Sequence, residues 1–238
     1  MGVIVKDSNR QHKFLSILFV VAIPVFLITL NVTWVVNDLR FYENGFRNNN
    51  ISLTTGIGEE DLSVVAQGIR GYFNSFDEPL SIRTKIFGNE RELFNSREII
   101  HMRDVKHLIW GVYILGSVAA IYITGNIAVG FLILGPGYGS ILCNLTTRGA
   151  IATIGFVAVI GITALLGFED LFRIFHQISF RNDFWILNPS TDFLLMMFPQ
   201  KFWFDTTLFL GAIIMGEATV LGGAASVTIF GIRSKRRI

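Results

Sequence analysis

Long apolar runs alternate with polar segments along this chain, and the runs are the right length for membrane helices. A helix that crosses a bilayer needs about 20 mostly apolar residues. The runs that qualify cover residues 14–36, 105–127 with an extension toward Leu134, 150–168 and 206–231. Gly, Pro, Ser and Thr occur inside them, as membrane helices allow. The pattern predicts an all-α membrane protein with four transmembrane helices, forming a single integral membrane domain over 1–238.

The basic residues predict how these spans are oriented. Lys and Arg gather before the first span and after the last, and Arg148 ends the connector between the second and third. The side that carries the basic residues is normally cytoplasmic, so we expect both termini to be cytoplasmic. Two regions then face outward, the outer cap 37–104 and the outer loop 169–205. The first span is too long for a cleaved signal peptide and is expected to remain as an anchor.

The outer cap contains shorter periodic segments. Residues 49–58 are rich in turn formers, and 59–76 is an amphipathic helix with apolar side chains at helical spacing, from Leu62 to Phe76. Residues 79–87 alternate enough to predict a short strand. Residues 91–108 then form a helix that runs directly into the second span. The cap is therefore expected to be small and mostly helical.

Composition narrows the class of function. Hydrophobic residues make up 51% of the chain, charged residues only 16%, and the formal net charge is +2. Such a sequence does not suit a soluble enzyme, a disordered chain or a nucleic-acid-binding protein. The single cysteine, Cys143, excludes an internal disulfide framework. No nucleotide-binding motif or G-x-S-x-G nucleophile motif is present, so we expect no cofactor. The metal-binding pattern H-E-x-x-H is absent and E-x-x-H occurs only once, so we expect no metal.

One histidine stands where the outer cap meets the second span. Helical spacing places Glu98 and His101 on one stripe, with Asp104 three residues further on. Both carboxylates are expected to reach the imidazole and to fix its tautomer. A salt-bridged helix end at the membrane boundary explains the same residues equally well, and the sequence leaves both interpretations open.

The outer loop 169–205 holds the second histidine within a region dense in Phe and Trp. Most of these rings are typical of an aromatic belt at the membrane interface. The polar side chains among them are candidates for a site, namely Arg173, His176, Arg181, Asn182 and Asp192. Ser190 or Thr191 is expected to cap a short apolar turn before Pro199, and that turn is expected to line a cleft open to lipid.

His101 and His176 are therefore predicted to lie on the same membrane face, at the ends of the second and third spans. Two imidazoles in that position are suited to general acid–base chemistry on a lipid-borne bond. Glu217, about midway along the fourth span, is the other ionisable candidate. We favour a protonated Glu217 bonded to another helix over a proton path, with Asn126 and Tyr122 as possible partners.

Two segments resemble a bacterial four-helix membrane family, formerly of unknown function, whose characterised branch is the lipoprotein intramolecular transacylase Lit. Its pattern joins E-x-x-H-x-x-D-V-K before the second span to F-H-x-x-x-F and W-x-x-x-P-x-T-D after the third. The matching residues are Glu98, His101, Asp104, Val105 and Lys106, then Phe175, His176, Phe180, Trp185, Pro189, Thr191, Asp192, Pro199 and Phe202.

The resemblance implies an acyltransferase on the outer face of the bacterial cytoplasmic membrane. Its substrate would be the N-terminus of a lipoprotein whose cysteine carries a diacylglyceryl thioether, and membrane lipid would be its other partner. The sn-2 acyl chain would move to the α-amino group of that cysteine, giving a lyso-form lipoprotein. The resemblance implicates His101 and His176 in catalysis.

We assign His101 as base, oriented by Glu98 or Asp104, and His176 to the alkoxide or to an acyl-carrying role. Arg173, Arg181 and Asn182 are candidates for stabilising the oxyanion, and Asp192 is a further supporting residue. The main alternative is a non-catalytic envelope protein that binds lipid or a partner through its outer cap. A transporter that uses Glu217 is a weaker alternative.

Overall fold

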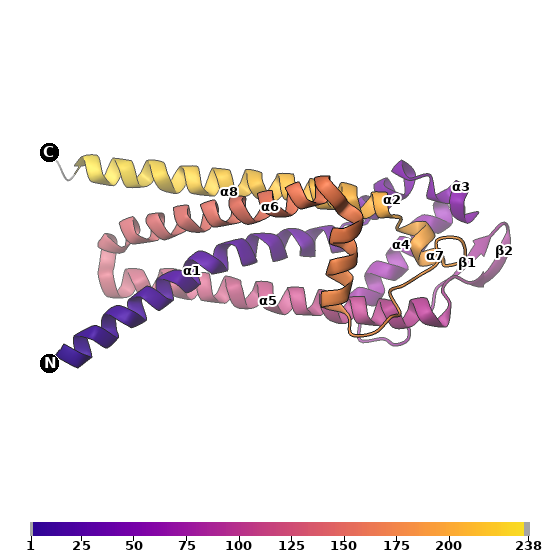
Figure 1. The fold of residues 1–238 in the computed structure, drawn as a ribbon, viewed down its shortest axis with the longest axis horizontal. Helices are drawn as coiled ribbons and strands as arrows, with labels where there is room; N and C mark the ends of the chain where they lie inside the picture. Colours follow the sequence, from indigo (N-terminus) through magenta and orange to yellow (C-terminus); the bar gives the residue numbers. More distant parts are fainter. Residues whose placement is uncertain (1, 236–238) are drawn as a thin grey trace. The chain divides into compact units, whose positions relative to one another are not determined.

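The computed structural model describes residues 2–235, with side chains from residue 13 to residue 231. Most of the terminal Lys and Arg side chains behind the predicted orientation lie outside this range. The described part is largely helical (Figure 1). Its elements are α1 (Gly2–Asn37), α2 (Leu39–Asn48), α3 (Ile51–Thr55), α4 (Glu59–Phe73), β1 (Arg83–Ile86), β2 (Asn89–Glu92), α5 (Ser96–Leu134), the 3₁₀ turn η1 (Gly135–Gly137), α6 (Tyr138–Ser179), α7 (Phe193–Met197) and α8 (Gln200–Lys235).

Each predicted span lies inside a longer helix, because the helices continue beyond the apolar runs at their ends. Among the described residues, three stretches are long and apolar enough to cross a membrane: Lys13–Asn37, Ser96–Ser179 and Gln200–Gly231. The second stretch has 84 residues and holds both α5 and α6, joined through η1. Four crossings of the membrane therefore remain a prediction. They require the chain to reverse its direction at η1, between α5 and α6.

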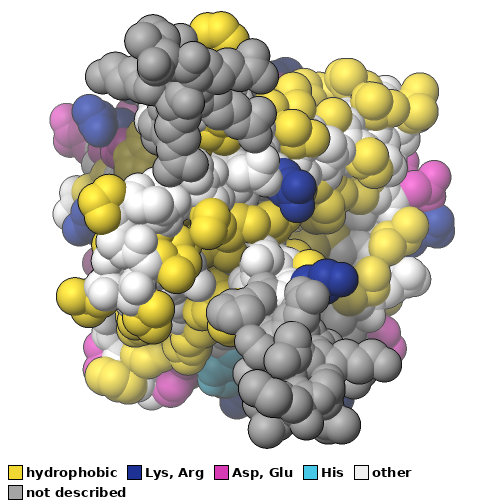
Figure 2. Space-filling model, turned by 90° about the vertical axis from the view of Figure 1, so that its left-hand side faces the viewer, with side chains coloured by type: hydrophobic (Ala, Val, Ile, Leu, Met, Phe, Trp, Pro, Cys, Tyr) yellow, Lys and Arg dark blue, Asp and Glu magenta, His cyan; other side chains and the backbone are white. Residues whose placement is uncertain are grey.

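The chain forms two compact units, and the described residues of the first lie in helical segments. It comprises residues 1–31, 113–162 and 210–238. Its core joins α1, α6 and α8 through Phe19, Ile23, Leu27, Leu145, Ala150, Val157, Ile214 and Ala218. Large apolar side chains such as Leu132, Ile133 and Val220 are exposed, and many hydrophobic side chains are visible on the described surface in Figure 2. Apolar contact all round a helix bundle is what a lipid environment requires.

Glu217 has a partner inside this first unit. Asn31 Nδ2 on α1 donates to Glu217 Oε2 on α8 over 2.7 Å. The expected partners are engaged elsewhere: Tyr122 donates to the Leu15 carbonyl, and Asn126 accepts from Tyr138. The bond thus joins two helices through an amide, as polar side chains in membrane helices commonly do.

The second unit comprises residues 32–112 and 163–209. The buried face of α4 includes Leu62, Val65, Ile69, Tyr72 and Phe73, as the apolar spacing predicted. Helix α2 approaches the start of α8 so closely that a Cβ at Gly45 would lie 2.1 Å from the Phe202 ring. Only glycine leaves room for that contact.

Several local predictions for the outer cap need correction. The 49–58 segment contains helix α3 as well as turns. Helix α4 ends at Phe73, so Phe76 leaves the helix and is 88% exposed. The predicted strand starts at Arg83 and pairs antiparallel with β2, which makes a small sheet in an otherwise helical fold. Phe87 and Gly88, both with positive φ, form the tight hairpin turn, and α5 therefore begins only at Ser96.

The region 169–205 is only partly a loop, because α6 continues to Ser179. The helix is interrupted at Gly167, whose φ of −172° and ψ of 74° are not helical. This interruption sets the direction of the helical segment that carries His176.

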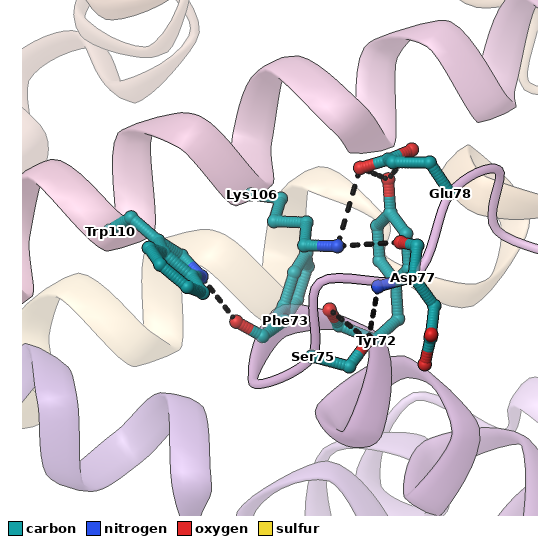
Figure 3. A network of polar contacts seen from close by, with 7 residues as sticks. All are labelled: Tyr72, Phe73, Ser75, Asp77, Glu78, Lys106 and Trp110. Carbon is teal, nitrogen blue, oxygen red and sulfur yellow. Dashed lines mark hydrogen bonds and ion pairs between the residues drawn. The ribbon is translucent and has the colours of Figure 1, made fainter.

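A buried lysine joins the end of α4 to α5 within the second unit (Figure 3). Lys106 Nζ donates to the Asp77 carbonyl over 2.7 Å and to Glu78 Oε1 over 3.3 Å. It also lies 4.1 Å from the centre of the Tyr72 ring, close enough for a cation–π interaction. The Tyr72 hydroxyl donates to the same carboxylate. Burial, together with this hydrogen bond to Glu78, raises the pKa of Tyr72, so the phenol stays protonated.

We predict that Lys106→Met destabilises the second unit, because the methionine fills the space but donates no hydrogen bond to Asp77 or Glu78. The expected cost is about 2 kcal/mol, the scale of a hydrogen bond to a charged group. Thermal unfolding of the purified protein in detergent measures it. Lys85→Met on β1, where the lysine is exposed, is the control and should leave the melting temperature unchanged. Equal melting temperatures for both variants would contradict the prediction.

Candidate functional site

The structure brings the two predicted histidines together. His101 lies near the start of α5 and His176 near the end of α6, and their ring centres are 5.9 Å apart. Each side chain is only 7% exposed. The Phe180 ring lies against both imidazoles, at 5.1 Å from His101 and 5.6 Å from His176. Two imidazoles at this separation are close enough to act on one bound group.

His176 is held in one tautomer by the backbone of its own helix. Its Nδ1 lies 2.8 Å from the Phe172 carbonyl oxygen. A carbonyl only accepts hydrogen bonds, so Nδ1 carries the proton and donates. In the neutral ring the proton acceptor is then Nε2. The Phe172 and Trp185 rings flank the imidazole, at 4.2 Å and 5.2 Å between ring centres.

His101 lacks the carboxylate partners that the sequence predicted. Its Nδ1 is buried and has no hydrogen-bond partner among the described residues. Glu98 instead accepts from the Asn95 and Leu194 backbone N–H groups, over 2.7 Å and 2.6 Å, and Asp104 accepts from Asn182 Nδ2 over 2.8 Å. Helical spacing placed the carboxylates near the ring, but the orphan N–H groups at helix ends compete successfully for Glu98. A buried unpaired imidazole nitrogen is unusual and suits a site that binds a polar group.

Glu98 organises the surroundings of the site. Asn95 Oδ1 accepts from the backbone N–H of Arg97 and of Glu98, while Glu98 Oε2 accepts from Asn95 N. This reciprocal pair is a capping box at the start of α5. The other oxygen, Oε1, accepts from the Leu194 N–H in the first turn of α7. The expected caps for α7, Ser190 or Thr191, are thus replaced by a carboxylate from another helix.

Asp192 has a supporting role in the loop and does not line the pocket described below. It is 9% exposed and accepts from Asn95 Nδ2 over 3.0 Å and from Asn188 N over 2.7 Å. Arg97 binds the same loop through the carbonyls of Ile186, over 3.2 Å, and Asp183. The start of α5 therefore holds the loop at several points, none of which depends on the histidines.

Both histidines line an apolar pocket of about 410 Å³. Its walls come from α1, α2, α4, α5, α6, α7 and α8 and the loop before α7, all within the second unit. The lining is Val32, Val35, Val36, Phe41, Tyr42, Ile69, Phe73, His101, Met102, Val105, Leu108, Ile109, Val112, Phe172, Phe175, His176, Phe180, Trp185, Leu187, Leu194, Leu195, Phe198, Phe202, Trp203 and Thr206. Sequence reasoning missed the α1 and α4 contributors, because valines in a predicted span and apolar positions on an amphipathic helix look like lipid-facing or core residues.

The remaining predicted residues separate into two groups. Arg181 and Asn182 line a second, polar pocket of about 390 Å³, together with Asp104 and His107. Arg173 pairs with Asp170 over 2.6 Å on an exposed surface and lines neither pocket, so it is not an oxyanion candidate. Within the described residues, no three His, Cys, Asp or Glu side chains cluster as metal ligands.

We predict that Glu98→Gln loosens α7 without unfolding the protein. A glutamine offers one acceptor oxygen in place of two. Because glutamine also completes a capping box, its oxygen stays with the Asn95 N–H, and the Leu194 N–H loses its partner at a cost of about 1–3 kcal/mol. Hydrogen exchange at the Leu194 amide should then accelerate at least about tenfold. Mass spectrometry of peptides covering 192–198 measures it. Glu59→Gln, in the exposed first turn of α4, is the control, and unchanged exchange in Glu98→Gln would refute the capping role.

The chain was compared with known proteins and structures. The family model described as lipoprotein intramolecular transacylase Lit matches residues 17–203. A curated protein of Aquifex aeolicus (strain VF5), named as uncharacterized, is 25% identical over 210 residues, 84% of this chain and 88% of that protein.

Solved structures show the same fold. The in meso structure of the membrane integral lipoprotein intramolecular transacylase Lit from Bacillus cereus superposes with a TM-score of 0.77 at 18% identity, covering 97% of this chain and 100% of that one. A structure of that protein with a histidine-to-arginine substitution gives a TM-score of 0.76 at 16% identity, over 97% of each chain. Because the family model matches most of its length, the chain belongs to the lipoprotein intramolecular transacylase Lit family.

Proposed function

We propose that this protein is an acyltransferase that moves the sn-2 acyl chain of a diacylglyceryl-cysteine to the α-amino group of the same cysteine. The product is a lipoprotein with an N-acyl and an S-monoacylglyceryl group. The observation that carries the proposal is the pair of imidazoles, 5.9 Å apart, in the wall of a largely apolar pocket. Membership of the Lit family supports it.

The pocket suits an acyl chain and its ester. Aromatic and aliphatic side chains form most of its wall, so a hydrocarbon chain gains by leaving water. The same enclosure favours neutral imidazoles, the form that accepts protons. It also keeps water from the ester, which suppresses hydrolysis in favour of transfer. Amine and ester belong to one molecule, so holding them in register supplies much of the rate.

We assign the proton transfers as follows. His101 takes one proton from the α-ammonium, which leaves an amine with a free lone pair. The amine nitrogen attacks the ester carbonyl carbon, the C–N bond forms, and the C–O bond to the glycerol breaks. The second proton of the nitrogen passes through His176 Nε2 to the glycerol oxygen. The first proton is released to water, so an ester and an ammonium become an amide, an alcohol and a proton.

We place this reaction on the outer face of the cytoplasmic membrane, with both termini in the cytoplasm. The proposal follows from the Lys and Arg residues near both ends of the chain and at Arg148. The outer cap 37–104 and the 169–205 region then lie on the side where lipoproteins are processed. The substrate enters from the lipid with its acyl chains first, and membrane lipid is the second partner.

His101→Ala and His176→Ala are each expected to reduce the lyso-form product at least about 100-fold, the scale of a lost general acid or base. Mass spectrometry of a lipoprotein N-terminus measures the product in cells that express each variant. Gln177→Ala, next to His176 but exposed, is the control and should keep full activity. Both histidine variants should still reach the membrane at the wild-type level. Normal product from both variants would refute the proposed function. It would favour the alternative, a non-catalytic envelope protein that binds lipid or a partner through its outer cap.

A further inference from the structure

A polar pocket adjoins the apolar one and has no role in the proton transfers. It measures about 390 Å³ and is lined by Asp104, His107, Leu108, Ser179, Phe180, Arg181 and Asn182. Leu108 and Phe180 also line the apolar pocket, so the two cavities meet at these side chains. The Phe180 ring is the one that packs against both imidazoles. A ligand that straddles Phe180 therefore has its apolar part beside the histidines and its polar part in the second pocket.

Asp104 is the acidic group of this polar pocket and is incompletely paired. Within the part of the chain that the structure describes, its carboxylate accepts one hydrogen bond, from Asn182 Nδ2 over 2.8 Å. No Lys, Arg or His nitrogen of the described residues lies within 4 Å of it as an ion-pair partner, although Arg181 and His107 line the same pocket. The Asn182 amide leaves most of the acceptor sites of the carboxylate open. A half-buried carboxylate with open acceptor sites favours a cationic donor.

We infer that Asp104 binds the α-ammonium group of the lipidated cysteine. This inference rests on the proposed function and assigns the residue that places the reacting nitrogen. Asp104 stands one helical turn after His101 on α5, so an ammonium at its carboxylate lies on the side of the helix that also carries the base. Phosphate is not the expected occupant, because the carboxylate would repel it.

This assignment replaces the predicted role of Asp104 as an orienting group for His101. It also divides the substrate between the two pockets, with the acyl chain in the apolar one and the cysteine nitrogen at the polar one. Arg181 donates from the same wall and suits a peptide carbonyl next to the cysteine, since a guanidinium donates and never accepts. Asp104 is thus a substrate-binding residue, and the negative charge of its carboxylate, more than the shape of the side chain, holds the ammonium group.

The test uses two ether-linked analogues of a diacylglyceryl-cysteinyl peptide, which transfer no acyl chain. One has a free α-amino group, and the other has a hydroxyl in its place. We expect the full-length protein in nanodiscs at neutral pH to bind the amine about tenfold more tightly than the alcohol, as for a charged hydrogen bond. Asp104→Asn should abolish that preference while keeping the bond from Asn182, because its side-chain carbonyl still accepts.

Glu60→Gln, exposed on α4, is the matched control and should keep the preference for the amine. Equal binding of both analogues by the wild type, or a full preference retained in Asp104→Asn, overturns the inference. Turnover of the corresponding ester by the wild type is measured separately and tests the proposed function. A wild type that prefers the amine analogue but turns over no ester supports the ammonium site and refutes acyl transfer.

Discussion

The Glu98 carboxylate is the constraint on which the rest of the site depends. It is almost fully buried, with 1% exposure, and it satisfies a backbone N–H at the start of α5 and another in the first turn of α7. Burial of an anion is tolerated when hydrogen bonds replace its water. Two helix N-termini, each with a partial positive charge, supply that replacement. One side chain therefore sets where α7 lies along the wall of the pocket.

A consequence is that His101 Nδ1 has no hydrogen-bond partner among the described residues. The nearest carboxylates on its own helix are engaged, Glu98 with backbone groups and Asp104 with Asn182. A histidine bonded to a carboxylate would favour the charged ring, whereas burial without such a bond favours the neutral ring. His176 differs, because the Phe172 carbonyl fixes its tautomer. The two imidazoles, although close, thus differ in how their Nδ1 atoms are bonded.

The two pockets differ in polarity, as the proposed lipidated substrate requires. The lining of the apolar pocket is nonpolar except at the histidines and a few hydroxyls. The polar pocket carries a carboxylate, a guanidinium and an amide. Their shared side chains, Leu108 and Phe180, leave the boundary between them apolar. In the proposed function, such a boundary would keep water away from the ester while protein groups solvate the charged end of the substrate. Joint occupation of both pockets would then select for an amphiphile.

The sequence by itself determined the class of protein, the long apolar helices and which two histidines to expect on one face. Apolar runs long enough to cross a bilayer are expected to form helices, because a helix hydrogen-bonds each backbone N–H and C=O group within its own segment. The amphipathic spacing of 59–76 likewise predicted α4 apart from its end, because one face of that helix had to be buried. The N-x-x-E spacing of Asn95 and Glu98 was also readable as a capping box.

Only the tertiary structure decided which groups meet. The helical interruption at Gly167 and the bonds from Asn95, Arg97 and Glu98 to the loop before α8 join segments about 90 residues apart in sequence. Spacing along one helix describes neighbours within a few turns and carries no information on such contacts. For that reason Asp104 and Glu98 were expected at the imidazole. Instead, Asp104 accepts from Asn182 in the loop between α6 and α7, and Glu98 accepts from Asn95 and from Leu194 on α7.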